Sequence, residues 1–78
     1  MEDQVLYRFN RGQNETIYFR YYEYKGKKYL DLRIFFQPEN SEEMKPTKKG
    51  ITIPIDLFSE FKKAIASCDK RISSTRTN

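Results

Sequence analysis

The sequence lacks histidine and tryptophan and contains a single cysteine, Cys68. A lone cysteine cannot form a disulfide within one chain, and without histidine the chain offers no set of zinc ligands. A nucleophilic enzyme needs a base beside its nucleophile, and the sequence contains no such pairing and no phosphate-binding glycine loop. We therefore expect no enzymatic activity, no metal and no cofactor.

Long hydrophobic runs are also absent. No apolar stretch approaches the roughly 20 residues that span a membrane, and the acidic N-terminus is unlike a signal peptide. We therefore expect an intracellular protein without a membrane partner. Its place is the cytoplasm or nucleoid, or the nucleus if the source is eukaryotic.

The chain has 78 residues, which corresponds to one small domain. A domain of this size buries only about 60% of its unfolded surface. Because neither a disulfide nor a metal can supplement the core, self-association is the expected source of extra stability. Fifteen Lys and Arg against 11 Asp and Glu give a net charge of +4. This excess is modest, so the placement of the charges matters more than their sum.

Aromatic residues, in contrast, are plentiful and clustered. Eight of the 12 lie between Tyr18 and Phe36, among five Lys and Arg residues. Tyr24-Lys25-Gly26-Lys27 separates two runs rich in aromatic and β-branched residues, and Gly26 can adopt the positive φ of a two-residue turn. The pattern predicts a hairpin of residues 16–24 and 27–36, in which Tyr24 pairs with Lys27.

This register divides the hairpin into two faces, because side chains alternate along a strand. One face, the apolar face, carries Ile17, Phe19, Tyr21, Leu30, Leu32 and Ile34. The other, the aromatic-charged face, carries Thr16, Tyr18, Arg20, Tyr22, Tyr24, Lys27, Tyr29, Asp31, Arg33 and Phe35. We expect the apolar face to form the core and the aromatic-charged face to bind a ligand. We also expect Asp31 to form a salt bridge with Arg20.

Two further strands are indicated outside the hairpin. Residues 5–9 predict a short strand within an N-terminal segment, 1–15. Residues 51–53 predict another, which Pro54 ends. Between the hairpin and this last strand lie a loop with exposed glutamates and a basic ribbon, residues 44–50.

From about residue 55 to 71 the hydrophobic period becomes helical. Apolar residues recur at spacings of four, four, three and four, in the stripe Leu57, Phe61, Ile65, Cys68 and Ile72. Strands followed by one helix make an α+β fold. The stripe can cover the sheet or pack against its own copy, so Leu57, Phe61, Ile65 and Cys68 are candidate dimer-interface residues. On this stripe Cys68 is expected to be packed rather than reactive.

Three segments of the chain carry a family resemblance. They are Tyr24-Lys25-Gly26-Lys27, Leu30-Asp31-Leu32-Arg33 and Met44-Lys45-Pro46-Thr47-Lys48-Lys49-Gly50-Ile51. In this order they resemble the positive cofactor 4 family of transcriptional coactivators and its bacterial and phage relatives. The resemblance covers about residues 17–69. The chain departs from the family at Thr47, where family members often have glycine.

The resemblance implies a four-stranded curved antiparallel sheet followed by one C-terminal helix. It further implies a homodimer formed largely through the helices, and single-stranded DNA binding without strong sequence preference. The DNA-binding domain is then expected over residues 16–72, followed by a disordered tail over residues 73–78.

The family's DNA-contacting positions fall on ten residues of this chain: Tyr24, Lys25, Lys27, Arg33, Phe36, Lys45, Pro46, Lys48, Lys49 and Gly50. The aromatic-charged face adds three candidates, Arg20, Tyr22 and Tyr29. Tyrosine rings stack on bases while Lys and Arg neutralise phosphates. Phe36 has the parity of the apolar face, so its participation requires a bulge or a bend.

These residues predict a single-stranded-DNA-binding protein with a role in transcription, replication or repair. Two alternatives stay open. An RNA-binding or RNA-chaperone module is one, because a stacking platform accepts either backbone unless the 2′-hydroxyl is read. A dimeric adaptor whose exposed tyrosines contact another protein, such as the transcription machinery, is the other.

Overall fold

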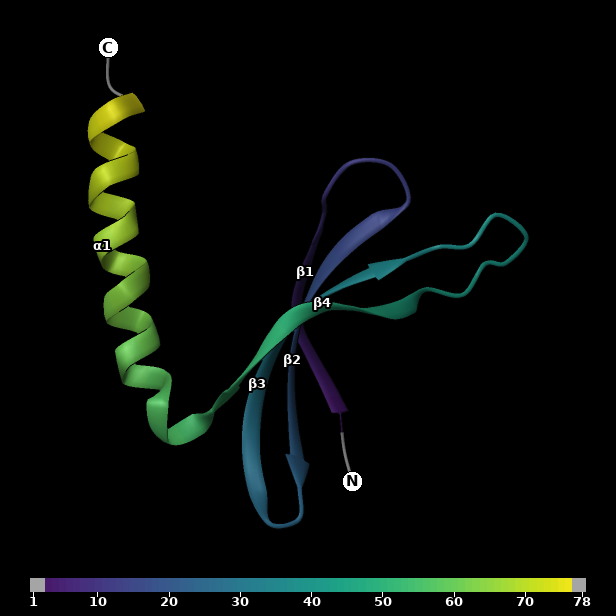
Figure 1. Cartoon of the computed structure of the whole chain (residues 1–78), viewed down its shortest axis with the longest axis horizontal. Coiled ribbons are helices and arrows are strands. Elements are labelled where there is room, and N and C mark those ends of the chain that lie inside the picture. The colour runs from purple at the N-terminus through teal and green to yellow at the C-terminus, as the bar shows by residue number, and fades with distance from the viewer. Residues whose placement is uncertain (1–2, 77–78) are drawn as a thin grey trace.

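The computed structural model describes residues 3–76 and shows a sheet of four antiparallel strands followed by a helix (Figure 1). The elements are β1 (Asp3–Asn10), β2 (Glu15–Tyr24), β3 (Lys27–Phe36), β4 (Lys45–Pro54), the 3₁₀ turn η1 (Ile55–Leu57) and α1 (Phe58–Arg76). The strands lie in the order β1-β2-β3-β4. The predicted α+β class, with a four-stranded antiparallel sheet and one C-terminal helix, is confirmed. No helix within residues 3–76 is long and apolar enough to cross a membrane.

The central hairpin adopts the predicted register. β2 and β3 pair without interruption from Tyr24 with Lys27 to Glu15 with Phe36. Lys25 has a φ of 52° and Gly26 a φ of 78°. Positive φ at both central residues is the feature of a type I′ turn, whose twist matches that of the flanking strands. The division of the hairpin into an apolar face and an aromatic-charged face therefore holds.

The apolar face is only partly covered within one chain. Leu30 and Ile34 are buried, whereas Phe19, Tyr21 and Leu32 are half-buried. The core is therefore smaller than the apolar face predicts.

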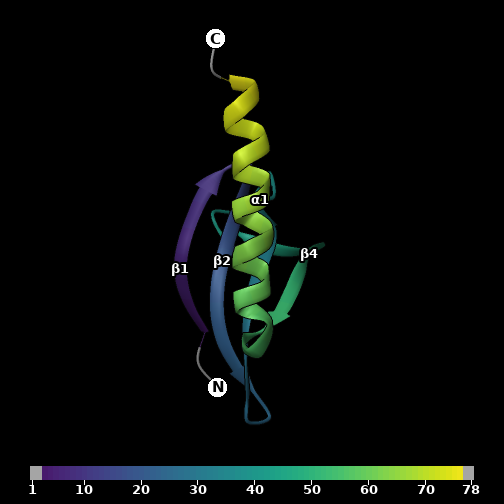
Figure 2. The same ribbon diagram turned by 90° about the vertical axis from the view of Figure 1, so that its left-hand side faces the viewer.

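α1 stands in front of the apolar face but apart from it, as two perpendicular views show (Figures 1 and 2). A groove of about 740 Å³ separates the two, lined by Phe19, Leu30 and Leu32 of the sheet and by Phe61 and Ile65 of α1. Cys68 on α1 is exposed. The expectation that Cys68 is packed is thus wrong for the single chain, because α1 does not close onto the sheet.

Both ends of the fold extend further than predicted. β1 begins at Asp3 and ends at Asn10, with a register irregularity between Val5 and Tyr7. α1 continues to Arg76, and within it the Ser73 hydroxyl donates to Asp69 Oδ1 at 3.3 Å. Residues 73–76 are therefore helical in the structure, where the sequence predicted the start of a disordered tail. Residues 1, 2, 77 and 78 lie outside the described part of the chain.

Candidate nucleic-acid interface

The aromatic-charged face lies on the side of the sheet opposite α1, because the groove beneath α1 is lined by the apolar face. The two faces of one hairpin therefore meet different surroundings. The apolar face meets the helix across the groove, and the aromatic-charged face meets solvent.

A buried carboxylate, Asp31, organises the centre of the aromatic-charged face. Asp31 is only 1% exposed, although it lies in the middle of a solvent-facing surface. Asp31 Oδ2 accepts hydrogen bonds from Arg20 Nη2 at 2.9 Å and Arg33 Nε at 3.1 Å. Asp31 Oδ1 accepts from Arg33 Nη2 at 2.9 Å and Thr52 Oγ1 at 2.8 Å. The predicted salt bridge between Arg20 and Asp31 is confirmed, and Arg33 and Thr52 join it.

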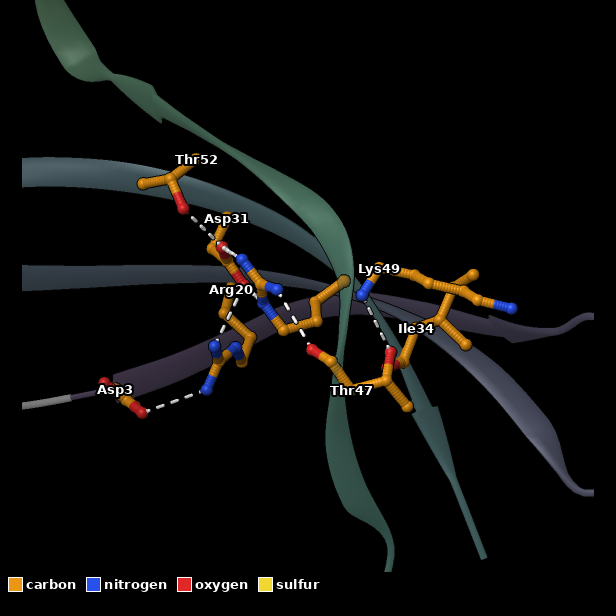
Figure 3. Close-up of polar contacts among 8 residues, drawn as sticks. Asp3, Arg20, Asp31, Ile34, Thr47, Lys49 and Thr52 are labelled. Atoms are coloured by element: carbon orange, nitrogen blue, oxygen red, sulfur yellow. Dashed lines mark hydrogen bonds and ion pairs between the residues drawn. The ribbon is translucent and has the colours of Figure 1, made fainter.

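The group continues to β1, where Asp3 Oδ2 accepts a hydrogen bond from Arg20 Nη1 at 3.3 Å. Figure 3 shows Asp31 between Arg20 and Thr52, with Asp3 beyond Arg20. We call Asp3, Arg20, Asp31, Arg33 and Thr52 the Asp31 cluster. Two arginines oppose two aspartates, so the cluster is neutral and leaves no uncompensated charge at the centre of the face.

The ionisation of Asp31 depends on these partners. Burial raises the pKa of the Asp31 carboxyl, but hydrogen bonds from Arg33, Arg20 and Thr52 and the charge of Arg33 outweigh it, and the pKa falls below 3.8. The same hydrogen bond from Arg33 raises the pKa of its guanidinium. Asp31 and Arg33 are therefore both charged near neutral pH.

Gly50 belongs to this arrangement for a steric reason. A Cβ at Gly50 would lie 2.6 Å from the Leu32 carbonyl oxygen and 2.9 Å from Arg33 Cζ. Glycine therefore leaves room for the Arg33 side chain to lie against β4, where the Thr47 carbonyl oxygen accepts from Arg33 Nη1 at 3.0 Å. The predicted binding residues Arg33 and Gly50 thus have a packing role within the sheet.

Rings and guanidinium groups stack beside the cluster. Arg8 Cζ lies 5.9 Å from the centre of the Tyr18 ring, Tyr18 stacks on Phe35 at 4.1 Å, and Arg20 Cζ lies 5.2 Å from the Phe35 ring. Phe35 is consequently buried. Phe35 thus lies on the aromatic-charged face, as the register predicts, but Tyr18 and Arg20 cover it.

Sequence reasoning missed Arg8. Arg8 pairs with Tyr18 across β1 and β2, so it shares the aromatic-charged face. Alternation along β1 could have placed it there, but the irregularity between Val5 and Tyr7 shifts the parity of the strand and hides the pattern.

The tyrosines of the face differ in how free their rings are. Tyr22 and Tyr29 stack on each other across the hairpin, with ring centroids 5.5 Å apart, and both are half-buried. Tyr24 is 48% exposed at the end of β2, and Lys25 Nζ lies 5.3 Å from the centre of its ring. Tyr24 therefore has the most exposed ring of the aromatic-charged face.

The predicted basic ribbon forms a bulge in β4. Arg33 pairs with Gly50 and Phe35 with Pro46, so the single residue Ile34 of β3 lies opposite three residues of β4. We call these three residues, Thr47, Lys48 and Lys49, the basic bulge. Lys48 and Lys49 are exposed, and neither belongs to an ion pair found within residues 3–76.

Phe36 and Lys45 lie differently from the other candidates. They pair with each other at the end of the β3–β4 ladder, and Phe36 also pairs with Glu15. The bulge lies in β4, whereas the β2–β3 ladder runs unbroken through Phe36, so Phe36 keeps the parity of the apolar face. Pro46 pairs with Phe35 and therefore stays on the aromatic-charged face.

The family model described as Transcriptional Coactivator p15 (PC4) matches residues 12–64. Among curated proteins, the RNA polymerase II transcriptional coactivator SUB1 of Saccharomyces cerevisiae is 31% identical over 71 residues, which cover 87% of this chain. A putative RNA polymerase II transcriptional coactivator of Caenorhabditis elegans is 31% identical over 49 residues, or 63% of this chain. The chain spans only 24% and 40% of the lengths of these two relatives.

Solved structures share the fold at low sequence identity. A PC4 homolog from Burkholderia pseudomallei K96243 has a TM-score of 0.75 and 18% identity, covering 87% of this chain and 98% of its own. The protein in a MoSub1–ssDNA complex has a TM-score of 0.62 and 22% identity, covering 91% and 81%. The bacteriophage T5 homolog of PC4, implicated in recombination-dependent DNA replication, has a TM-score of 0.54 and 20% identity, covering 99% and 97%.

Proposed function

The chain belongs to the Transcriptional Coactivator p15 (PC4) family, and on this premise we propose that it binds single-stranded DNA with little sequence preference. The observation that carries the proposal is the aromatic-charged face. It combines an exposed tyrosine, Tyr24, with exposed lysines around a centre whose own charges cancel. Such a surface offers stacking to any base and attraction to any phosphate. Duplex DNA hides its base faces, so stacking favours single strands.

Residues at the rim and at the centre of the aromatic-charged face have different proposed roles. Lys25 and Lys27 at the hairpin turn and Lys48 and Lys49 on the basic bulge are exposed, and we assign phosphate contacts to them. Arg20 and Arg33 keep only 20% of their side chains exposed and are held by Asp31. Their assigned role is to shape the surface, with phosphate contact secondary.

Stacking is assigned first to Tyr24. The Tyr22–Tyr29 pair offers a second, half-buried platform beside it. Phe36 and Lys45 lie at the far end of the sheet with the opposite parity, so we place them at the margin of the interface.

We further propose that the protein acts as a homodimer. The chain has an accessible surface of 6639 Å², compared with about 5,000 Å² for a compact monomer of this mass. Its radius of gyration is 15.0 Å, compared with about 11.5 Å for a compact chain of this length. The excess surface includes the groove between the sheet and α1, and a second copy is the occupant that we assign to it. Leu57, Phe61, Ile65 and Cys68 would then be covered by the partner.

The cellular role that we propose is a DNA transaction that exposes single strands. Coactivator relatives favour transcription, and the phage structural neighbour favours replication. Both processes supply the unpaired bases that the aromatic-charged face can stack.

Fluorescence anisotropy with labelled oligothymidylate, the matched duplex and the matched oligouridylate tests the proposal. Titrations at about 50 and 200 mM salt should give tight binding to the single-stranded DNA, with a log–log salt slope of about −0.7 for each phosphate contacted. Equal affinity for the duplex, or a salt-independent affinity, would contradict the proposal. Stronger binding to oligouridylate would instead identify an RNA-binding module, and no binding to any strand at low salt would favour a protein adaptor.

A further inference from the structure

The basic bulge interrupts the β3–β4 ladder at a defined point. Continuing the register of Arg33 with Gly50 by one residue would pair Ile34 with Lys49. The next observed pair is instead Phe35 with Pro46, so two extra residues of β4 leave the ladder. Backbone groups that lose their ladder partner must find another, because a buried polar group without one is costly.

Where the ladder is interrupted, the Thr47 hydroxyl forms hydrogen bonds to the backbone of both strands. Thr47 Oγ1 donates to the Ile34 carbonyl oxygen at 2.7 Å and accepts from the Lys49 backbone N–H at 3.1 Å. A hydroxyl can do both at once, since it carries one donor and two acceptor lone pairs. Figure 3 shows Thr47 beside Ile34 and below Lys49, with the Lys49 side chain pointing away from Asp31.

The main chain of Thr47 is also held by a side chain of β3. The Thr47 carbonyl oxygen accepts from Arg33 Nη1 at 3.0 Å, and Arg33 is itself held by Asp31 through two hydrogen bonds. Thr47 is therefore tied to β3 through both its side chain and its main chain. Lys48 and Lys49 follow directly, so a fixed Thr47 limits the conformations open to both lysines.

From this geometry we infer that Thr47 is a positioning residue, which holds the backbone of the basic bulge so that Lys48 and Lys49 project toward a nucleic-acid phosphate. The inference rests on the proposed single-stranded DNA binding. Immobilising a flexible binding segment before the ligand arrives lowers the entropic cost of association. A valine at this position keeps the shape of threonine but can neither donate to Ile34 nor accept from Lys49.

The test compares Thr47→Val with Thr47→Ser, which keeps the hydroxyl, in oligothymidylate titrations over a range of salt. We expect Thr47→Ser to bind like the wild-type protein and Thr47→Val to bind about tenfold more weakly, equivalent to about 1.4 kcal/mol. The salt slope of Thr47→Val should shrink by up to about 1.4, the value for two lost phosphate contacts on a single strand.

A double-mutant cycle separates positioning from general destabilisation. Introduced into a Lys48→Ala/Lys49→Ala background, Thr47→Val should cause no further loss, because the groups that it positions are gone. An equal loss in both backgrounds, or wild-type affinity of Thr47→Val, would overturn the inference.

A measurement without DNA gives an independent check. The Lys49 amide proton should exchange faster in Thr47→Val than in Thr47→Ser, and equal exchange in two folded variants would also overturn the inference. Failure of the proposed function is recognised separately, because the wild-type protein itself would then not bind oligothymidylate.

Discussion

The two faces of the sheet differ in how many of their polar and apolar groups find a partner within one chain. On the aromatic-charged face, the Asp31 carboxylate has four hydrogen-bond donors, the charges of Arg20 and Arg33 are balanced by Asp3 and Asp31, and Phe35 is covered by its neighbours. On the apolar face, α1 stands off, and Tyr7 and Ile65 remain 66% and 53% exposed. The carboxylate at the centre of the polar side is thus satisfied within one chain, although Arg20 Nε beside it is buried without a hydrogen-bond partner among residues 3–76. The apolar side stays largely uncovered.

This difference underlies the two partners that we propose, a second copy of the chain and a single strand of DNA. An apolar surface left uncovered gains most from a second apolar surface, which a copy of the same chain provides. A neutral centre with exposed lysines at its rim is the surface that we propose for a flexible anion with stackable bases. The predictions below test each side of this comparison, beginning with the largest expected effect.

Removing the carboxylate at the centre of the polar side should be the most damaging change. Asp31→Ala leaves Arg20 and Arg33 half-buried without their common partner, and we expect the free energy of unfolding to fall by about 3–5 kcal/mol. Urea unfolding followed by circular dichroism measures the loss. Asp3→Ala is the matched control at the exposed end of the same cluster and should cost no more than about 1 kcal/mol. Equal losses for the two variants would show that the cluster does not depend on its buried member.

A charge introduced on the apolar stripe of α1 should disrupt the proposed dimer, and so tests the apolar side of the comparison. Ile65→Asp places a carboxylate in the groove assigned to the second copy, and we expect the dissociation constant of the dimer to rise at least about a hundredfold, or about 2.8 kcal/mol. Light scattering coupled to size exclusion measures the mass. Ser67→Asp is the control, because Ser67 is exposed on α1 and lies off the stripe. A wild-type protein that is monomeric at micromolar concentration would contradict the proposed dimer.

Loss of the most exposed ring of the aromatic-charged face should weaken DNA binding without unfolding the sheet. Tyr24→Ala removes a stacking platform, which corresponds to about 1–3 kcal/mol of binding free energy. Tyr24→Phe keeps the ring and should bind oligothymidylate almost as well as the wild-type protein. If both variants bind normally, the stacking surface lies elsewhere on the face.

Acid should lower the stability of the protein by protonating Asp31 on the polar side. Because the pKa of Asp31 is lowered in the folded state, its contribution to stability is present above the ordinary value near 3.8 and is lost as the pH falls through the folded pKa. Unfolding free energies measured between about pH 7 and pH 3 should therefore decline below about pH 4. The decline should be shallower in Asp31→Asn, which has no proton to gain, and an equal slope would contradict the assignment to Asp31.

The smallest expected effect concerns the edge of the face. Arg8→Ala removes an exposed guanidinium above Tyr18, and we expect the salt slope for single-stranded DNA to decrease by about 0.7, the value for one contact. Arg11→Ala is the control, because Arg11 pairs with Glu15 at 3.3 Å in the β1–β2 loop. Identical slopes for the two variants would exclude β1 from the interface.

Much of the hairpin could be predicted from local patterns. The Tyr24–Lys27 turn sets one register, and strand alternation then assigns every later residue to a face. The salt bridge between Arg20 and Asp31 follows from that register, because the two residues lie directly opposite each other. The helix could be predicted from its hydrophobic period. Its continuation through residues 73–76 could not, because these residues are polar and do not extend the apolar stripe.

Other parts of the site depend on contacts between distant residues. The burial of Phe35 requires Tyr18 and Arg20 above it, and the position of Arg33 requires both Asp31 and a glycine at residue 50. The basic bulge requires that β4 pair with β3 at both ends while leaving three residues opposite one. No local propensity encodes such a mismatch.

The sequence by itself determined the α+β class, the register of the central hairpin, the separation of its two faces and the apolar stripe of the helix. These properties follow from alternation, helical period and turn geometry, which act over a few residues. Only the tertiary structure decided that Arg20 and Arg33 neutralise a buried Asp31, that Thr47 closes an interrupted ladder, and that α1 stands away from the sheet. These outcomes depend on which distant groups meet when four strands pair, and on how much apolar surface one short chain can cover.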